Sequence, residues 1–216
     1  MKLPILAHTP LSNYENCPRK FWHMYVAKDL PWQEPTPEML EGRRQHEAFD
    51  RALKAGDAAS APLPEMAAYV LQADGLKEYE HKMAVAASGT PCNWQVDCTF
   101  FRGIADVTIV APPNALILDW KTGKKREDPA ELEGFALLLK AHYPNLEYIG
   151  GAYVWLKHGG MGQLHDLSDT KGAMRRVKTQ WEGMSARPLD KEWNATPNAL
   201  CGWCPVKKCE HWKDRG

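Results

Sequence analysis

The chain has 216 residues, of which 44% are hydrophobic and 25% are charged, a balance typical of a globular protein with its own core. Its 27 basic and 27 acidic side chains cancel, which excludes a strongly basic protein but not a local basic groove for nucleic acid. The opening segment Met1–Ala7 is too short for a signal peptide, and no apolar run would span a bilayer, so we expect a cytoplasmic protein with reduced or metal-bound cysteines.

The first half of the chain predicts helices. A capping box from Ser12 to Glu15 begins a helix that runs to about Ala27. A second helix starts at Thr36-Pro37, because proline suits the first helical position, and it ends at Gly56. A loop rich in alanine and proline follows, and then a short helix over residues 65–72.

The hydrophobic period then changes to that of strands. We expect a second capping box, Asp128 to Glu131, to begin a helix through about residue 141, and the tail from Leu189 to be irregular. These elements predict one α/β domain, 1–216, with a central mixed β-sheet flanked by helices and a cysteine-rich tail at 189–216. The predicted strands are 78–86, 94–101, 103–110, 115–121, 148–156 and a weak one at 162–165, and a last helix covers 169–184.

Two acidic residues end neighbouring predicted strands, Asp106 and Asp119. Lys121 falls on the same strand face as Asp119, because side chains alternate with period two. Such a set either forms an internal ion pair or makes an oxygen-rich site for Mg²⁺ or Mn²⁺ with a lysine beside it. His46 lies on the apolar face of its helix and is either a core histidine or a further metal ligand.

The cysteines predict a second metal site. Cys201 and Cys204 form a Cys-x2-Cys pair, and Cys209 adds a third thiolate. Cys17, just before Pro18, is the obvious fourth ligand, but spacing alone does not separate zinc from an iron–sulfur cluster. Cys92 and Cys98 flank a predicted strand and read as packing residues. The nine tryptophans either pack, or include a few stacking platforms for unpaired bases.

Five stretches, in this order, resemble the RecB-like exonucleases of the PD-(D/E)XK type. The resemblance is greatest to the CRISPR-associated RecB-like nucleases and their phage-encoded relatives, and it runs from one end of the chain to the other. The matching stretches are residues 11–21, 42–46, 103–106, 119–123 and 201–209.

This resemblance implies a restriction-endonuclease-like core and two kinds of cofactor. It implies a divalent metal, Mg²⁺ or Mn²⁺, held by His46, Asp106, Asp119 and the backbone carbonyl of Trp120, with Lys121 as the catalytic lysine. It also implies a 4Fe–4S cluster rather than zinc in the thiolate site, with the ligands Cys17, Cys201, Cys204 and Cys209.

The sequence departs from the family on the helix after the lysine strand. Where the family has Gln-x-x-x-Tyr, this chain has Glu131 and Phe135, and we interpret Glu131 as the capping partner of Asp128. Glu80 aligns with an acidic residue that assists the active site in some relatives. We nevertheless interpret it as a charge on a strand surface.

The function expected from these residues is a Mg²⁺- or Mn²⁺-dependent deoxyribonuclease, acting as an exonuclease on DNA ends in recombination, repair or phage DNA processing. No phosphate-binding Gly-x-x-x-x-Gly-Lys-Ser/Thr loop is present, so a helicase or recombination protein would act as a separate partner. Residues 124–126 are all basic and either contact DNA phosphates or form a solvated turn. The alternatives are an inactive, cluster-containing DNA-binding accessory protein and a nicking or structure-selective endonuclease.

Overall fold

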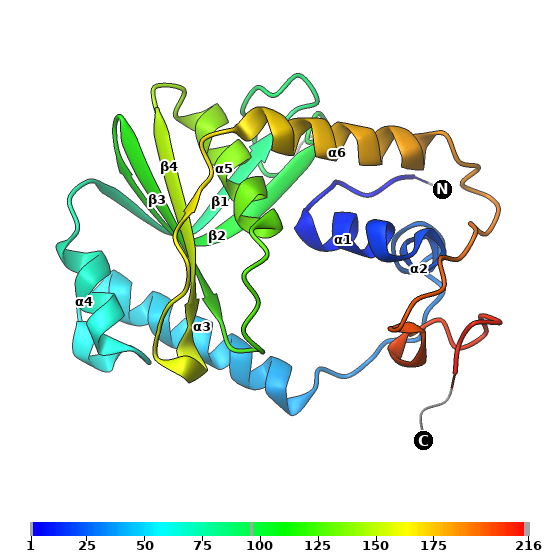
Figure 1. The fold of residues 1–216 in the computed structure, drawn as a ribbon, viewed down its shortest axis with the longest axis horizontal. Coiled ribbons are helices and arrows are strands. Elements are labelled where there is room, and N and C mark those ends of the chain that lie inside the picture. The colour runs from blue at the N-terminus through cyan, green and yellow to red at the C-terminus, as the bar shows by residue number, and fades with distance from the viewer. Residues whose placement is uncertain (1, 96, 214–216) are drawn as a thin grey trace. The chain divides into compact units, whose positions relative to one another are not determined.

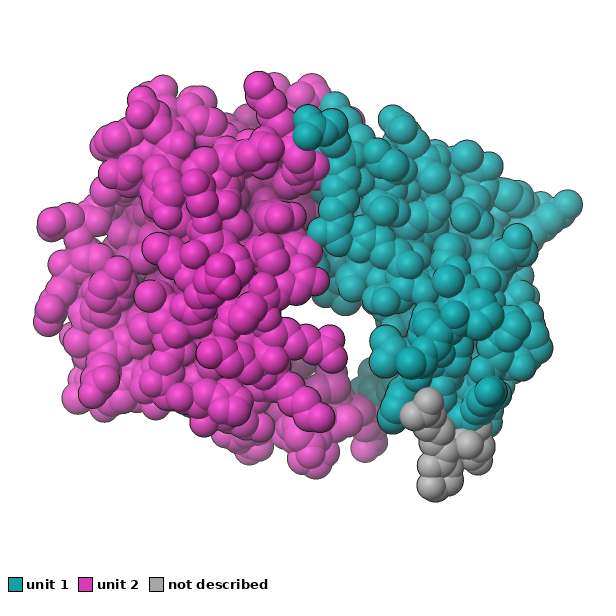
Figure 2. Space-filling view, viewed as in Figure 1, with its two compact units in different colours: residues 1–33, 175–216 teal, residues 34–174 magenta. Residues whose placement is uncertain are grey.

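The computed structural model describes residues 2–95 and 97–213. The chain forms two compact units: residues 34–174 make one, and the two segments 1–33 and 175–216 together make the other (Figure 2). We call the first the sheet unit and the second the four-cysteine unit. Among the described residues, no helix is long and apolar enough to cross a membrane.

A six-stranded mixed sheet organises the sheet unit (Figure 1). Strand β2 pairs antiparallel with both β1 and β3, whereas β3 and β4 are parallel. A parallel pair needs a crossover connection, and helix α5 provides it. The bounds are β1 Leu76–Val85, β2 Phe101–Ala111, β3 Asn114–Lys121, α5 Ala130–His142, β4 Tyr148–Trp155, β5 Gly160–Met161 and β6 His165–Asp166, of which the last two pair with β4.

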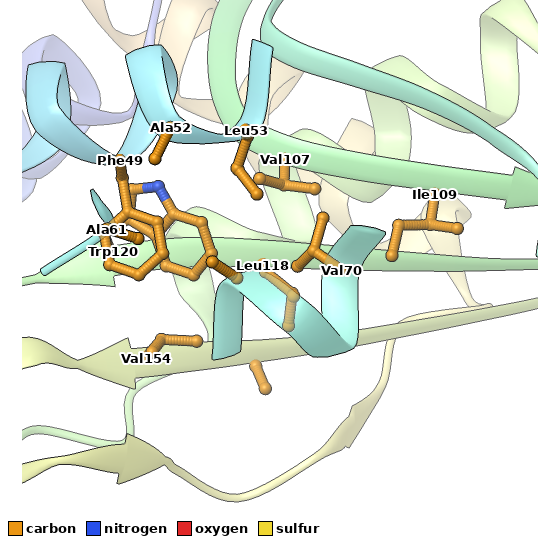
Figure 3. Close-up of a cluster of buried hydrophobic side chains, with 12 residues drawn as sticks. Phe49, Ala52, Leu53, Ala61, Val70, Val107, Ile109, Leu118, Trp120 and Val154 are labelled. Carbon is orange, nitrogen blue, oxygen red and sulfur yellow. The ribbon is translucent and has the colours of Figure 1, made fainter. Parts of the chain in front are cut away.

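Helices cover the two faces of this sheet. On one face, α3 (Pro37–Ala55) and α4 (Pro64–Gln72) pack onto β2, β3 and β4 in a buried hydrophobic cluster (Figure 3). Its centre is a stacked pair, Phe49 and Trp120, with ring centroids 4.3 Å apart. On the other face, Leu132 of α5 lies against Gly151 of β4. The predicted mixed sheet flanked by helices is therefore confirmed.

Two predicted strands are wrong. In the weak strand predicted at 162–165, residues 162–164 are irregular and only His165 belongs to a strand, the short β6. The other is the strand predicted at 94–101. The described residues of 94–100 form turns and irregular backbone, and β2 begins at Phe101 and continues unbroken to Ala111. Position 96 lies outside the described residues. The N–H of Phe100 donates to the carbonyl of Val85 in β1 at 2.9 Å, but the described residues of 94–100 form no strand of their own.

The four-cysteine unit brings both ends of the chain together. Its helices are α1 (His8–Asn16), α2 (Pro18–Phe21), the π-helix η1 (Trp22–Ala27) and the part of α6 (Thr170–Ser185) from Arg175 onward. The aromatic rings of Tyr14, Phe21 and Trp193 form its core, and the Phe21 and Trp193 rings stack with centroids 5.7 Å apart.

Two expectations for this unit are wrong. The single helix to Ala27 is broken at Cys17, whose extended backbone follows from the proline after it, because a residue before proline avoids the α region. Ser12 lies inside α1 rather than at its cap. Glu15 accepts hydrogen bonds of 2.8 and 2.6 Å from Arg176, so its partner is 161 residues away rather than at the helix start.

Candidate active site and four-cysteine site

Three side chains of the sheet unit form a group with metal-ligand chemistry. His46 comes from α3, Glu80 from β1 and Asp106 from β2, and one ligand atom from each lies within 4.8 Å of the other two. The Nδ1 atom of His46 is 3.2 Å from Oδ1 of Asp106. Burial lowers the pKa of His46, but the Asp106 carboxylate outweighs it, and the net pKa is raised.

Glu80 belongs to this group, although we interpreted it from the sequence as a strand-surface charge. Its neighbours pair normally with β2, Tyr79 with Val107 and His81 with Ala105, but Glu80 itself has a left-handed backbone with φ of 51°. That conformation is uncommon for a residue with a Cβ and occurs mostly where surrounding structure imposes it. No local sequence pattern signals it, which is why we interpreted Glu80 as a strand-surface charge.

Asp106 joins the metal-ligand group to the next strand. Its Oδ2 accepts a 2.6 Å hydrogen bond from the backbone N–H of Trp120, while Oδ1 faces His46. The Trp120 side chain points into the core against Phe49. The backbone of Trp120, which we expected to supply a carbonyl ligand, is therefore tied to Asp106 through its N–H.

Asp119 and Lys121 form an ion pair beside this group. Lys121 Nζ lies 2.5 Å from Oδ2 of Asp119 and 2.7 Å from Oε2 of Glu131, which is in the first turn of α5. The Asp119 side chain is buried, and burial together with the negative Asp106 raises its pKa to about 8. Burial lowers the pKa of Lys121, but the two carboxylates outweigh it and hold it above the usual value.

The capping interpretation of Glu131 is wrong. Asp128 accepts a 3.1 Å hydrogen bond from the N–H of Ala130, but Glu131 turns to Lys121 instead of reaching back to the helix start. Phe135, the other departure from the family pattern, is buried with its ring against Gly103. A Cβ at Gly103 would lie 2.9 Å from that ring, so the glycine and the phenylalanine fit each other.

Gly42 explains how α3 brings His46 to the strands. A Cβ built on Gly42 would lie 2.9 Å from Oγ1 of Thr122, the residue after Lys121. Only a residue without a side chain lets the helix approach the end of β3 this closely. The two sequence motifs, Gly-x-x-x-His and Asp-x-Lys-Thr, therefore meet at this contact.

A cleft of ≈ 1110 Å³ opens over the metal-ligand group. His46 and Glu80 are in its wall, and so is Lys124 from the basic turn after β3. Lys125 is 3.6 Å from Glu127 and does not line the cleft. The full lining is Glu38, Met39, Gly42, Arg43, His46, Glu47, Asp50, Glu80, Thr122, Gly123, Lys124, Lys157 and His158.

The residues present fit a hard divalent cation. One imidazole nitrogen and two carboxylates converge, and a third carboxylate, Asp119, is buried beside Asp106. Carboxylate oxygens are the ligands that Mg²⁺ and Mn²⁺ prefer. A bound cation would also offset the repulsion between Asp106 and Asp119 that raises the Asp119 pKa.

In the four-cysteine unit, the four predicted thiol ligands line one small cavity of ≈ 40 Å³. Each sulfur faces a donor: the N–H of Thr196 lies 3.4 Å from Cys17, that of Asn198 lies 3.3 Å from Cys201, and the Arg19 guanidinium lies 3.4 Å from Cys209. Burial raises the pKa of Cys204, and the backbone N–H of Val206 opposes it. The four cysteines are free of disulfides.

Four thiols at this cavity could hold either zinc or an iron–sulfur cluster, because both are bound by cysteine sulfurs. Cys92 and Cys98 take no part in this cavity, and the Cys92 thiol is 3.7 Å from the hydroxyl of Thr99.

Comparisons with known proteins agree with this geometry. The family model described as the PD-(D/E)XK nuclease superfamily matches residues 5–209, which include parts of both units. The crystal structure of the protein SSO0001 is similar at a TM-score of 0.52 and 14% identity, covering 98% of this chain and 89% of that one. A candidate exonuclease from Eubacterium rectale is similar at 0.51 and 10% identity, covering 92% and 86%. At these identities the likeness shows a shared fold, and no curated protein sequence matches the chain.

Proposed function

Since the chain belongs to the PD-(D/E)XK nuclease superfamily, we propose that it is a divalent-metal-dependent deoxyribonuclease acting on DNA ends. The observation that supports this most is the convergence of His46, Glu80 and Asp106 at a cleft, with the Asp119–Lys121 pair beside them. If Asp119 and Lys121 formed only a structural ion pair, the nearby carboxylates of Asp106 and Glu80 and the imidazole of His46 would have no role.

The proposed roles follow from these contacts. His46, Glu80, Asp106 and Asp119 would hold the cation, which supplies Lewis-acid stabilisation of the charge that develops on the phosphate. Lys121 carries its proton between Asp119 and Glu131 and would donate it in a hydrogen bond to the attacking water or to a phosphate oxygen.

Glu131 would act as a positioning residue for that lysine. Its carboxylate accepts a hydrogen bond from Nζ, and the amide oxygen of the family's glutamine could do the same without carrying a charge. The family's tyrosine has no counterpart at Phe135, so contacts to the substrate from this helix would come from elsewhere.

We also propose a 4Fe–4S cluster bound by the four cysteines, in a RecB-like nuclease of the CRISPR-associated kind. The support is the shared cavity and the N–H donors at the sulfurs, together with the resemblance of residues 11–21 and 201–209 to that family. Such an enzyme would serve recombination, repair or phage DNA processing beside a separate helicase or recombination protein.

The direct test uses linear DNA labelled at either the 5′ or the 3′ end, single- and double-stranded, with Mg²⁺, Mn²⁺ or EDTA. We expect shortening from an end with metal and none with EDTA, and loss of activity in Asp106→Asn. A closed circular substrate is the control, because an exonuclease leaves it intact whereas a nicking enzyme does not. Tight DNA binding without cleavage under any metal would favour the inactive accessory protein.

A further inference from the structure

Tyr153 is a buried aromatic residue beside Lys121 that the proposed roles leave unused. Strand β4 pairs parallel with β3, and the register places Tyr153 opposite Asp119 and Trp155 opposite Lys121. Residues that pair in this way point to the same face of a sheet, and so do alternate residues of one strand. The tyrosine therefore shares a face with the lysine, and the Nζ atom of Lys121 lies 5.3 Å from the centre of the Tyr153 ring. That distance is within the range of a cation–π interaction.

The hydroxyl group of Tyr153 fixes the ring in this place. It donates a 2.8 Å hydrogen bond to the backbone carbonyl of Asp128. Burial, followed by the negative charge of Glu131, raises the pKa of Tyr153, so the hydroxyl keeps the proton that it donates. Helix α5 begins at Ala130, directly after this contact, and carries Glu131 in its first turn. One side chain thus contacts the lysine and also the start of the helix that supplies the second carboxylate of that lysine.

Trp155 holds the same connection between β3 and α5. Its Nε1–H donates to Oε1 of Glu127 at 3.3 Å, and its ring lies 5.8 Å from that of Tyr153, measured between centroids. The two aromatic residues of β4 therefore bind consecutive residues of the connection, Glu127 and Asp128. Tyr153 differs from Trp155 in that its ring also faces the ammonium group of Lys121.

An aromatic face suits this side of the lysine better than another carboxylate would. An ammonium group has three N–H donors, and Nζ of Lys121 already lies 2.5 Å from Asp119 and 2.7 Å from Glu131. A third carboxylate would take the remaining N–H. The ring of Tyr153 attracts the cation through its face and accepts no conventional hydrogen bond, so it restricts the ammonium group without occupying the last donor as a carboxylate would.

We propose that Tyr153 is a positioning residue for hydrolysis. Its ring holds the ammonium group of Lys121 in the orientation from which the lysine donates to the attacking water or to a phosphate oxygen. Its hydroxyl holds that ring against the start of α5. The inference rests on the proposed nuclease function, and Tyr153 acts through Lys121 rather than on the DNA itself.

The kinetic test separates the ring from the hydroxyl. Single-turnover cleavage of end-labelled linear DNA is measured with Mn²⁺ over a range of enzyme concentrations above that of the DNA. Tyr153→Leu removes the ring and should lower the maximal rate by about tenfold, whereas Tyr153→Phe keeps the ring and should lose no more than about threefold. The enzyme concentration that gives half of the maximal rate should be unchanged in both, because DNA does not contact this residue. A rise in that concentration with an unchanged maximal rate, or an equal loss in the two variants, would overturn the role of the ring.

The matched control is Ile149→Ala, which changes another buried residue of β4. Ile149 pairs with Ala115, at the opposite end of the β3–β4 ladder from Lys121. Loss of its buried methyl groups should lower the stability of the protein. At a temperature where circular dichroism shows every variant to be folded, this control should keep the wild-type maximal rate. A loss as large as that of Tyr153→Leu would show that any weakening of β4 slows cleavage, and the positioning role would be rejected.

A second measurement observes the lysine without any cleavage. In protein labelled with ¹³C at the lysine Cε, the ring current of Tyr153 should shift the methylene resonance of Lys121, which is identified by its absence in Lys121→Met. The shift should persist in Tyr153→Phe and disappear in Tyr153→Leu. A Lys121 resonance that is the same in Tyr153→Leu as in the wild type would overturn the contact. Wild-type protein with the shifted resonance that cleaves no DNA under any metal would instead refute the nuclease function, and with it the role in hydrolysis, while the contact itself remained.

Discussion

Glu80 combines a strained backbone with a place in the metal-ligand group. A left-handed conformation costs a residue with a Cβ on the order of 1–3 kcal/mol, and glycine avoids that cost. Burial and the nearby carboxylates Asp106 and Asp50 also raise the pKa of Glu80, so its charge is unfavourable without a cation. Stability and cation binding therefore make opposite demands on this position.

We predict that Glu80→Gly raises the free energy of unfolding of the metal-free protein by up to about 1 kcal/mol while weakening Mn²⁺ binding at least tenfold. Thermal unfolding and calorimetric Mn²⁺ titration measure the two effects. Glu80→Asn is the matched control, because asparagine tolerates the left-handed region and keeps one oxygen. A glycine variant that loses stability and keeps Mn²⁺ affinity would contradict the assigned role.

Lys121 and Glu131 should differ in their effect on cleavage. Lys121→Met removes the only proton donor between Asp119 and Glu131 in the described site, so single-turnover cleavage should fall by at least about 10²-fold. Glu131→Gln should have a much smaller effect, because Asp119 still holds the ammonium group. Metal-free DNA binding should be unchanged in both, and a wild-type cleavage rate in Lys121→Met would remove the lysine from the mechanism.

At the scale of elements, the approach of α3 to the end of β3 depends on Gly42. We predict that Gly42→Ala destabilises the protein by about 1–3 kcal/mol and slows cleavage, because the new methyl group would overlap Thr122 and displace His46. The double variant Gly42→Ala with Thr122→Ala should recover part of the stability, which a double-mutant cycle by urea unfolding measures. Additive losses in the double variant would show that the two residues are not in contact.

The sequence predicts elements well where the signals are local. Helix α3 begins with the Thr36 side chain accepting from the N–H of Met39 at 3.3 Å and ends at Gly56 in the left-handed conformation, both as expected. The apolar run ending in Asp119 is a strand, and Asp106 lies on its neighbour. These features depend on a few adjacent residues, so the sequence contains the necessary information.

The predictions were wrong where a residue interacts with a partner that lies far from it in the sequence. Glu15 and Glu131 both match capping boxes, yet Arg176 and Lys121 bind them more strongly than a helix terminus would. The apolar residues near position 98 are typical of a strand, but the described residues of that segment form turns and irregular backbone. The left-handed backbone of Glu80 is likewise not revealed by any local sequence pattern.

At the scale of the molecule, the four-cysteine site ties segments from the two ends of the chain. We predict that Cys17→Ser leaves the sheet unit folded but makes residues 1–33 and 175–213 sensitive to limited proteolysis, because the tail has few buried apolar residues of its own. Wild-type protein should be brown, with iron and sulfide in nearly equal amounts, and Cys17→Ser should be bleached.

The control for this experiment is Cys98→Ser, because Cys98 is exposed and lies outside the cavity. It should keep the colour and the proteolytic pattern of the wild type. A colourless wild-type protein with one zinc would correct the metal and keep the tie between the segments. A Cys17→Ser protein with its full cluster would show that the fourth ligand is another residue.

The four-cysteine unit is built from two segments that are distant in the sequence. This affects how the protein folds during its synthesis. Residues 1–33 leave the ribosome before residues 34–174, but the segment that covers Phe21 and pairs with Glu15 follows only after them. At about 5–20 residues per second, that interval is roughly 7–28 s. Over that time the sheet unit can fold as a continuous piece, while the aromatic helices ahead of it remain exposed and depend on chaperones or on rapid completion of the chain to escape aggregation.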